Sequence, residues 1–374
     1  MKKILLLLFV ITLGFGCSHD EQINTIQNSD KDLTEAEALD ILHNLLSTNP
    51  QTRNYISKLT VNAKSYYSVD NEDYPMYHIL IEGEELGFAL ISADKRCPEI
   101  ICYVPKGQLS DTILYEGTSE LIRMAEVGVA EKIRMRSSRE RYSSDSLYLI
   151  SEVTPLLETT WDQKKPYNAM NETTTCPLFA NEDYNWKYPV GCQAVAVAQV
   201  LAYYEKSLGF SINWQNLKQN PTISESEIEK AALIANYMKL IAINLDMEYD
   251  CDGGGATINK AQAYLSINGV SLTNQTSGQF NDVAYSWLDN GNLLYLTGRE
   301  LINGEDSGRH AWLADGYKKY GYHGSTYTYY LLHMNMGWGG NWDGYYSMKS
   351  NMSINFRPSN SLKFDQITYY KISD

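Results

Sequence analysis

Cys192 begins a run of uncharged, mostly apolar residues that is expected to be buried in the core of a folded protein. The run from Cys192 to Tyr204 reads CQAVAVAQVLAYY, and Pro189 and Gly191 predict a turn just before it. Its small and apolar residues predict a buried helix, which would hold the thiol on a rigid support. A thiol at a helix N-terminus lies at the positive end of the helix dipole, and this environment favours thiolate, the nucleophilic form. Cys192 is therefore a candidate nucleophile; the alternative is that it is one more buried cysteine.

The first residues have the pattern of an export signal. Two lysines at positions 2 and 3 precede the apolar run 4–11, and the segment ends in LGFGC at Cys17. This pattern predicts a signal peptide over residues 1–16. A cysteine directly after small residues resembles a bacterial lipoprotein signal, in which the cysteine is lipidated; the alternative is an ordinary signal with an incidental cysteine. We expect export, followed by anchoring to the cell envelope at the outer membrane through a polar tether up to Asp32, or by release outside the cell.

The charge and the cysteine content narrow the classes of partner. The formal net charge of −14 argues against nucleic acid or an anionic membrane surface. Six cysteines are present, so five remain besides the lipidation candidate, and an odd number leaves at least one thiol free in an exported protein. Cys97 with Cys102, and Cys176 with Cys251, could pair and leave Cys192 free, although the sequence does not establish this. The spacings do not fit a zinc site, and no metal or other cofactor is expected.

The length of 374 residues suits two domains, and the pattern divides near residue 145. The first part combines an amphipathic helix capped by Thr34 with short strands and a second helix, which predict a small α+β unit. These elements are expected at 34–46, 75–81, 86–92, 100–104 and 121–133. The polar stretch 134–146, rich in Arg and Ser, predicts an exposed linker open to cleavage; the alternative is a solvated helix end. The expected units are the tether and first domain, 17–145, and a second domain, 146–374.

The second part predicts helices first and antiparallel strands later, which is typical of an α+β fold. Helices are expected at 192–204, 224–245 and 257–267, a tight turn at 251–255, and strands at 293–297, 310–314 and 327–336.

A cysteine nucleophile needs a base, and three histidines of the second part are candidates. His310 begins an apolar strand directly after a glycine-containing loop, where a side chain can be held rigidly and still face a cleft. His333 is the competitor, since strand alternation places it on the same face as Asn335. His323 lies in GYHG, a predicted hairpin tip, and is expected to be solvated.

A base also needs an orienting group, and an oxyanion needs donors. Asn335 is the candidate for fixing the imidazole tautomer, with Trp338 shielding that bond from water. Asp315 is a possible second orienter, although it also suits a turn residue in DGY. The amide of Gln163, together with the backbone N–H of Cys192, could hold a tetrahedral oxyanion; taken alone, this glutamine would be an ordinary surface residue.

Four stretches resemble motifs of the streptopain family of cysteine peptidases. They are WDQKKPYN at 161–168, GCQAVAVAQ at 191–199, RHAWLADGY at 309–317, and HMNMGWGG at 333–340 with DGYY at 343–346. Residues 87–96 resemble the family's inhibitory propeptide. The order of cysteine, histidine and asparagine is that of papain-like peptidases, and the match favours His310 over His333 as the base.

The resemblance implies an α+β fold: a papain-like cysteine peptidase domain preceded by a small α+β inhibitory propeptide domain. It further implies an exported endopeptidase zymogen that acts on proteins or peptides, is inhibited by its own propeptide and prefers a hydrophobic residue one position before the scissile one. Its catalytic residues would be Cys192, His310, Asn335 and Gln163. The alternatives are a non-catalytic surface lipoprotein that binds a partner and a papain-fold amidase or transferase.

The chain departs from the family's pattern beside the expected site. Met336 replaces a usual tryptophan, Arg309 a glycine, and Gln193 and Val195 replace smaller or hydroxylated residues. None of these changes removes a catalytic group. We expect altered rate or specificity, with loss of activity as the alternative.

Overall fold

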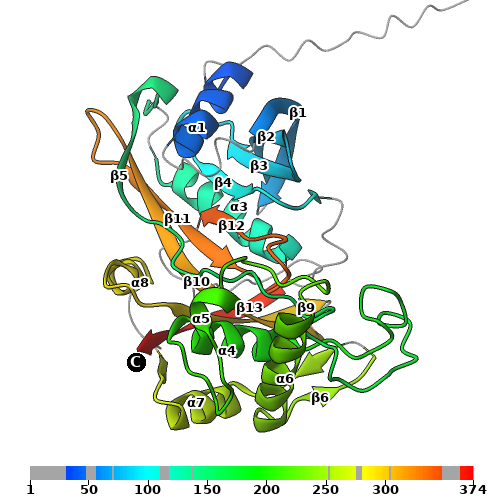
Figure 1. Cartoon of the computed structure of the whole chain (residues 1–374). Coiled ribbons are helices and arrows are strands. Elements are labelled where there is room, and N and C mark those ends of the chain that lie inside the picture. The colour runs from blue at the N-terminus through cyan, green and yellow to red at the C-terminus, as the bar shows by residue number, and fades with distance from the viewer. Residues whose placement is uncertain are drawn as a thin grey trace, which may run out of the picture.

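The computed structural model describes residues 31–47, 56–69, 71–109, 118–136, 139–251, 253–274, 280–302, 305–347 and 363–373 (Figure 1). The predicted signal peptide, the lipidation candidate Cys17 and most of the tether lie outside these residues. Among the described residues, no helix has both the length and the apolar character needed to cross a membrane.

The N-terminal part, residues 31–136, contains the predicted α+β elements. They are α1 (Glu35–Ser47), β1 (Ile56–Val69), β2 (Glu72–Gly83), β3 (Leu86–Ser92), β4 (Ile100–Val104) and α3 (Thr118–Arg134). Thr34 begins α1 through a reciprocal capping box, because Glu37 N donates to Thr34 Oγ1 at 3.2 Å and Thr34 N donates to Glu37 Oε2 at 2.7 Å. The predicted helices, the β2–β3 hairpin and β4 are confirmed. Strand β1 was not predicted.

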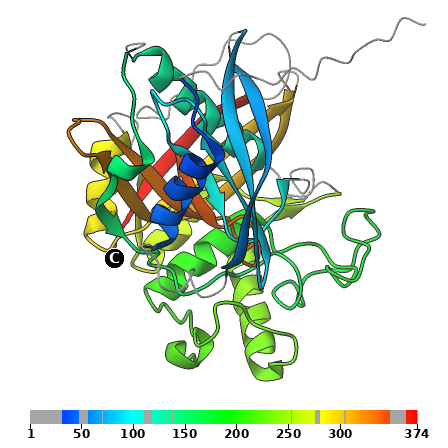
Figure 2. The same ribbon diagram turned by 90° about the horizontal axis from the view of Figure 1, so that it is seen from above.

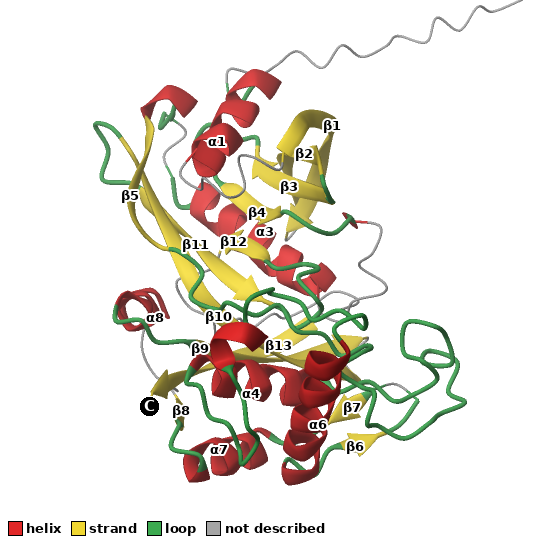
Figure 3. Cartoon of the chain, in the orientation of Figure 1, coloured by secondary structure: helices red, strands yellow, loops and turns green. Residues whose placement is uncertain are grey.

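The C-terminal part, residues 139–373, places helices before most of its strands. The helices are α4 (Cys192–Tyr203), α5 (Trp214–Leu217), α6 (Ile228–Asn244), α7 (Ile258–Ile267) and α8 (Phe280–Asp289). The strands are β5 (Leu147–Val153), β6 (Glu248–Tyr249), β7 (Gly254–Gly255), β8 (Ser271–Asn274), β9 (Leu294–Ile302), β10 (Glu305–Tyr322), β11 (Thr328–Asn335), β12 (Gly344–Ser347) and β13 (Lys363–Ser373). Every residue of α4 from Gln193 to Ala202 is buried, as its sequence predicts. Figure 3 shows α4, α6 and α7 gathered on one side of β9 and β13.

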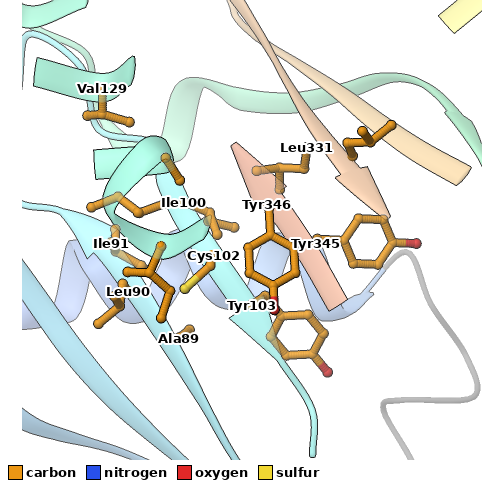
Figure 4. Packing of buried hydrophobic residues seen from close by; sticks show 14 of the residues in the cluster. Ala89, Leu90, Ile91, Ile100, Cys102, Tyr103, Val129, Leu331, Tyr345 and Tyr346 are labelled. Atoms are coloured by element: carbon orange, nitrogen blue, oxygen red, sulfur yellow. The ribbon is translucent and has the colours of Figure 1, made fainter. Parts of the chain in front are cut away.

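One sheet runs through both parts of the chain. Among the described residues it has 11 strands in the order β1-β2-β3-β4-β12-β11-β10-β9-β13-β8, with β5 paired to β10. The junction is the antiparallel pair β4–β12, in which Cys102 faces Tyr346 and Tyr103 faces Tyr345. Figure 2 shows the blue and cyan N-terminal strands beside the orange and red C-terminal strands. The side chains of Cys102, Tyr103, Tyr345 and Tyr346 pack together across this junction (Figure 4).

The predicted linker is anchored at its two described ends. The guanidinium of Arg136 lies 3.4 Å from the ring centroid of Tyr327, and Tyr142 packs on Tyr322 with ring centroids 5.0 Å apart. Strand β5 then begins at Leu147. The prediction of an exposed linker is therefore wrong at Arg136 and Tyr142, which are half-buried because they pack on Tyr327 and Tyr322 of the C-terminal part. Arg139 and Arg141 between them are exposed, as predicted.

One of the two possible disulfides is formed. Cys176 is bonded to Cys251, which ties the loop before α4 to the β6–β7 hairpin. The other suggested pair is not formed, since Cys97 and Cys102 are both buried free cysteines. The Cys97 thiol lies instead 3.0 Å from the hydroxyl of Tyr327, while Cys102 belongs to the core of the sheet on β4.

Candidate active site

Cys192 is the first residue of α4, the most completely buried helix of the C-terminal part. Gly191 before it has φ 91°, a value that side-chain-bearing residues rarely adopt. A Cβ at this glycine would lie 2.3 Å from Met247 Cε and 2.9 Å from the carbonyl oxygen of Gly254. Only glycine therefore fits this turn. Cys192 itself is half-buried and takes part in no disulfide, and as the first residue of α4 it places its thiol at the helix N-terminus.

The segment that carries Gln163 lies against the turn before this cysteine. Val190 N donates to the backbone oxygen of Gln163 at 2.9 Å. Asp162 accepts from Gln163 N at 2.6 Å, and burial raises the pKa of its carboxyl. The structure thus brings Gln163, expected from sequence as the oxyanion donor, next to the Val190–Cys192 turn.

His310 lies on β10, the strand that packs against α4, and is 4% exposed. Its Nε2 lies 3.1 Å from the backbone oxygen of Met336; since a carbonyl only accepts, Nε2 carries the proton. The ring stacks on Trp338 with centroids 4.4 Å apart and on Trp312 at 5.5 Å. Burial lowers the pKa of His310 to about 4, against the opposing effect of the Met336 bond. The imidazole is therefore neutral near pH 7 in this arrangement.

Asn335 lies on β11 opposite Leu313 of β10, and both the nitrogen and the oxygen of its amide are hydrogen-bonded. Its Nδ2 donates to the oxygen of Thr159 at 2.8 Å. Its Oδ1 accepts from Gln199 Nε2 at 2.9 Å and from Gly337 N at 3.2 Å. The expected hydrogen bond between Asn335 and His310 is not formed in this structure: the amide bonds to Thr159, Gln199 and Gly337, and His310 Nε2 bonds to Met336. Trp338 stacks on the imidazole, although the Asn335–His310 bond that it was expected to shield is not formed.

His333, the competing candidate for the base, is paired with Asp315. His333 Nδ1 lies 2.6 Å from Asp315 Oδ1, and Asp315 Oδ2 accepts from Leu157 N at 3.0 Å. Burial would lower the pKa of His333, but the Asp315 charge and hydrogen bond raise it overall. Asp315 thus pairs with His333 and not with His310. His323 is exposed at the β10–β11 connection and stacks on Tyr148, as predicted for a hairpin tip.

Two polar residues that the sequence reasoning missed support these segments. Asp343 Oδ1 accepts from Met336 N at 2.7 Å, and burial raises the pKa of this carboxyl to about 7. Gln199 is 1% exposed and bonds to Asn335. The available signal for Gln199 was a long polar side chain in the middle of a helix whose other residues, apart from Gln193 in its first turn, are small or apolar. No group of three possible metal ligands occurs among the residues that the structure covers.

The N-terminal part touches the loop that carries the partner of His310. This loop, residues 336–343, is named the glycine loop here. Trp342 N donates to the oxygen of Lys106 at 2.8 Å, and Lys106 Nζ lies 3.5 Å from the oxygen of Gly339. Gly107 lies directly against the Trp342 indole, because a Cβ there would be 3.3 Å from its Nε1. The N-terminal part therefore contacts the same loop that supplies Met336 and Trp338 to His310.

A buried polar cluster joins the two parts at a second place. Glu99 is 0% exposed, and its carboxylate receives Lys132 Nζ at 2.5 Å, both from the N-terminal part. Ser347 Oγ donates to Glu99 at 3.3 Å, and the Tyr327 hydroxyl donates to it as well; both belong to the C-terminal part.

Two family models match the N-terminal and C-terminal parts of the chain separately. Residues 161–346 match the Peptidase C10 family, and residues 30–126 match the Spi protease inhibitor family. The thiol protease/hemagglutinin PrtT of Porphyromonas gingivalis is 23% identical over 321 residues, which is 73% of this chain and 34% of PrtT. Streptopain of Streptococcus pyogenes is 24% identical over 304 residues, covering 70% of this chain and 71% of streptopain.

A solved structure shares the fold of both parts. It is a fragment of Prevotella intermedia prointerpain A, with a TM-score of 0.54 and 20% identity, covering 83% of this chain and 98% of that one. The expected α+β fold with its N-terminal inhibitory domain is thereby confirmed. The chain belongs to the peptidase C10 family, the streptopain family of cysteine endopeptidases, and carries an inhibitor-type propeptide domain ahead of its peptidase domain.

Proposed function

We propose that the chain is an exported cysteine endopeptidase zymogen in which Cys192 is the nucleophile and His310 the acid–base. The observation that carries this proposal is the position of the Cys192 thiol. It is half-buried at the N-terminus of a buried helix, beside the segment of Gln163, and β10 with His310 packs on that helix. This environment favours a reactive thiolate.

The proposed reaction is acyl transfer. The Cys192 thiolate attacks the peptide carbonyl, and the resulting oxyanion is stabilised by the Gln163 amide and the backbone N–H of Cys192. The imidazolium of His310 gives its proton to the leaving amine, and the C–N bond breaks. Neutral His310 then takes a proton from water, whose oxygen attacks the thioester; the C–S bond breaks, which releases the acid and restores the Cys192 thiolate beside the His310 imidazolium.

The described arrangement suits an inhibited precursor better than a working enzyme. The mechanism needs an imidazolium next to a thiolate, yet burial favours the neutral form of His310 here. Its Nε2–H donates to the backbone oxygen of Met336. We propose that loss of the N-terminal part frees the glycine loop, so that His310 can leave Met336 and use Asn335 as its orienting group. Cleavage between the peptidase and its propeptide is proposed near the exposed Arg141.

The experiment is an incubation of the chain from Ser18 onward under mild reducing conditions, beside Cys192→Ala, followed by intact mass and casein digestion. We expect the wild type to lose about 14 kDa, the mass up to a cut near Arg141, and to gain casein hydrolysis that a thiol-alkylating reagent blocks. If Cys192→Ala matures equally well, another protease makes the cut. A wild type that stays inert after limited trypsin cleavage near Arg141 would favour a non-catalytic binding module.

The proposed lipid anchor is tested separately. Cys17 follows the signal-like segment directly, and its lipidation would place the protein on the cell envelope. Full-length chain made in a bacterial host should partition into detergent after phase separation, whereas Cys17→Ser should stay in the aqueous phase. Equal partitioning of the two would favour an ordinary cleaved signal and release.

A further inference from the structure

Gln199 is a polar side chain at the centre of the most buried helix in the peptidase domain. It follows Cys192 by seven residues, two helical turns along α4, and is 1% exposed. A primary amide in such a place is costly unless its donors and acceptor are bonded. Its partners therefore explain what the residue does there.

The Gln199 amide bonds to two other segments of the site. Its Oε1 accepts from Thr159 Oγ1 at 3.1 Å and from Trp161 N at 3.2 Å. Its Nε2 donates to Asn335 Oδ1 at 2.9 Å. Asn335 in turn donates its Nδ2 to the oxygen of Thr159 at 2.8 Å, which closes a ring of hydrogen bonds.

These bonds connect the segments on which the proposed catalytic groups stand. Gln199 is on the helix that Cys192 begins, Trp161 is two residues before Gln163, and Asn335 is on β11 next to the strand of His310. Gln199, Thr159, Trp161 and Asn335 are each at most 3% exposed, so the network is shielded from water. In a water-poor interior such hydrogen bonds are strong and directional. Small displacements of catalytic groups lower the reaction rate steeply.

We infer that Gln199 is a positioning residue for the peptidase reaction. It fixes the nucleophile helix, the oxyanion segment and the Asn335 side chain relative to one another. The inference rests on the proposed function, since it assigns a role within that site. The competing view is that Gln199 only stabilises the core, in which case the folded, matured enzyme would not need its amide for turnover.

The test compares Gln199→Glu and Gln199→Met with Gln262→Met. Gln262 on α7 is a half-buried glutamine whose Nε2 donates to the oxygen of Leu272 at 2.9 Å, a bond outside the network of Gln199, Thr159, Trp161 and Asn335. Each chain is matured with a trace of tagged wild-type enzyme that is then removed. The measured quantities are Tm, kcat and KM on one peptide substrate, and the pH dependence of Cys192 alkylation.

We expect both Gln199 variants to lose about 10- to 100-fold in kcat with KM within about 3-fold, and to shift the alkylation profile. Gln262→Met should change Tm only. The glutamate keeps the acceptor for Thr159 and Trp161 but faces Asn335 Oδ1 with a second oxygen. Once protonated it can donate there, so its kcat relative to wild type should rise towards acid pH.

Opposing outcomes are separable. If the wild type is active and the Gln199 variants have the same kcat and alkylation profile as the wild type, whatever their Tm, this inference is wrong and the proposed function still stands. A wild type without thiol-dependent activity overturns the proposed function and this inference with it. If Gln199→Met does not fold, the isosteric glutamate and Thr159→Val, which removes only one of the bonds, carry the same comparison.

Discussion

His310 Nε2 lies 3.1 Å from the backbone oxygen of Met336, the position where the chain departs from its family's usual tryptophan. The amide N of the same residue is held by the buried carboxylate of Asp343 at 2.7 Å. The acceptor of His310 is thus fixed from within the glycine loop, while Lys106 of the N-terminal part binds the loop at Trp342. The glycine loop therefore both binds the buried imidazole of His310 and contacts the propeptide domain.

We predict that His310 titrates far below its usual range in the precursor. In full chain carrying Cys192→Ala, NMR of the histidine Cε1–H signals, assigned with His310→Gln, should give a pKa of about 4 because the ring is buried. In matured wild type the pKa should rise through pairing with the Cys192 thiolate. A midpoint near 6.5 in the precursor would contradict the arrangement described here.

The same shift has a consequence for stability with a definite sign. Because the folded-state pKa of His310 lies below its ordinary value of 6.5, the unfolded chain binds the proton first as the pH falls. The stability that His310 contributes is present above pH 6.5 and is lost towards pH 4. In urea unfolding, the free energy of unfolding of the precursor should fall by about 2 kcal/mol more between pH 7 and 4.5 than that of His310→Gln, because the other titrating groups are common to both chains. An equal pH dependence in both chains would argue against a neutral buried imidazole.

Cysteine accessibility gives a third prediction. In the chain from Ser18 onward, iodoacetamide without denaturant should modify Cys192 alone, because Cys97 and Cys102 are buried and burial raises the pKa of each thiol. Denaturant without reductant should allow three modifications, the three thiols outside the disulfide. Denaturant with reductant should add Cys176 and Cys251. Rapid modification of Cys97 or Cys102 in the native chain would show that the core around β4 is not closed.

The parts of the fold with strong local signals were predictable from sequence. The Thr34 capping box, the β2–β3 hairpin and the apolar helix after Gly191 each depend on residues close together in the chain. The Cys176–Cys251 pair and the exposure of His323 were also suggested correctly. Strand β1 was missed because its sequence, ISKLTVNAKSYYSV, alternates imperfectly and includes several polar residues.

The remaining features depend on contacts distant in sequence. Pairing of β4 with β12 joins residues of the two parts, and no local pattern in Ile100–Val104 indicates which edge it meets. The acceptor of His310 is a backbone oxygen, which sequence motifs do not identify. A sequence also does not reveal that Glu99 is a fully buried carboxylate, because glutamate is rarely buried without a partner and that partner is 33 residues away.

The turn before Cys192 allows a matched pair of glycine substitutions. Gly191→Ala places a Cβ at a positive φ of 91° and 2.3 Å from Met247 Cε, whereas Gly209→Ala meets only the positive φ of 84°, with no atom within 4 Å. Backbone strain alone should lower stability by about 1–2 kcal/mol in Gly209→Ala. Gly191→Ala should lower it further and slow alkylation of Cys192. Equal effects of the two changes would show that the turn has room for a side chain.

The buried cluster at Glu99 predicts how firmly the propeptide domain is held. Lys132→Met leaves the Glu99 carboxylate buried without its cation, which should cost about 3–5 kcal/mol and lower the Tm of the precursor. Because Tyr327 and Ser347 reach Glu99 from the peptidase domain, the loss should loosen the junction between the two domains and speed release of the propeptide. The matched control is Lys58→Met, since Lys58 pairs with Glu82 on the exposed face of β1–β2 and such a surface pair is worth about 0–1 kcal/mol. Maturation followed by gel under reducing conditions should be faster for Lys132→Met than for wild type and unchanged for Lys58→Met. Equal rates in all three chains, together with a lowered Tm for Lys132→Met, would place the cluster in the core of the propeptide domain and remove it from the control of release.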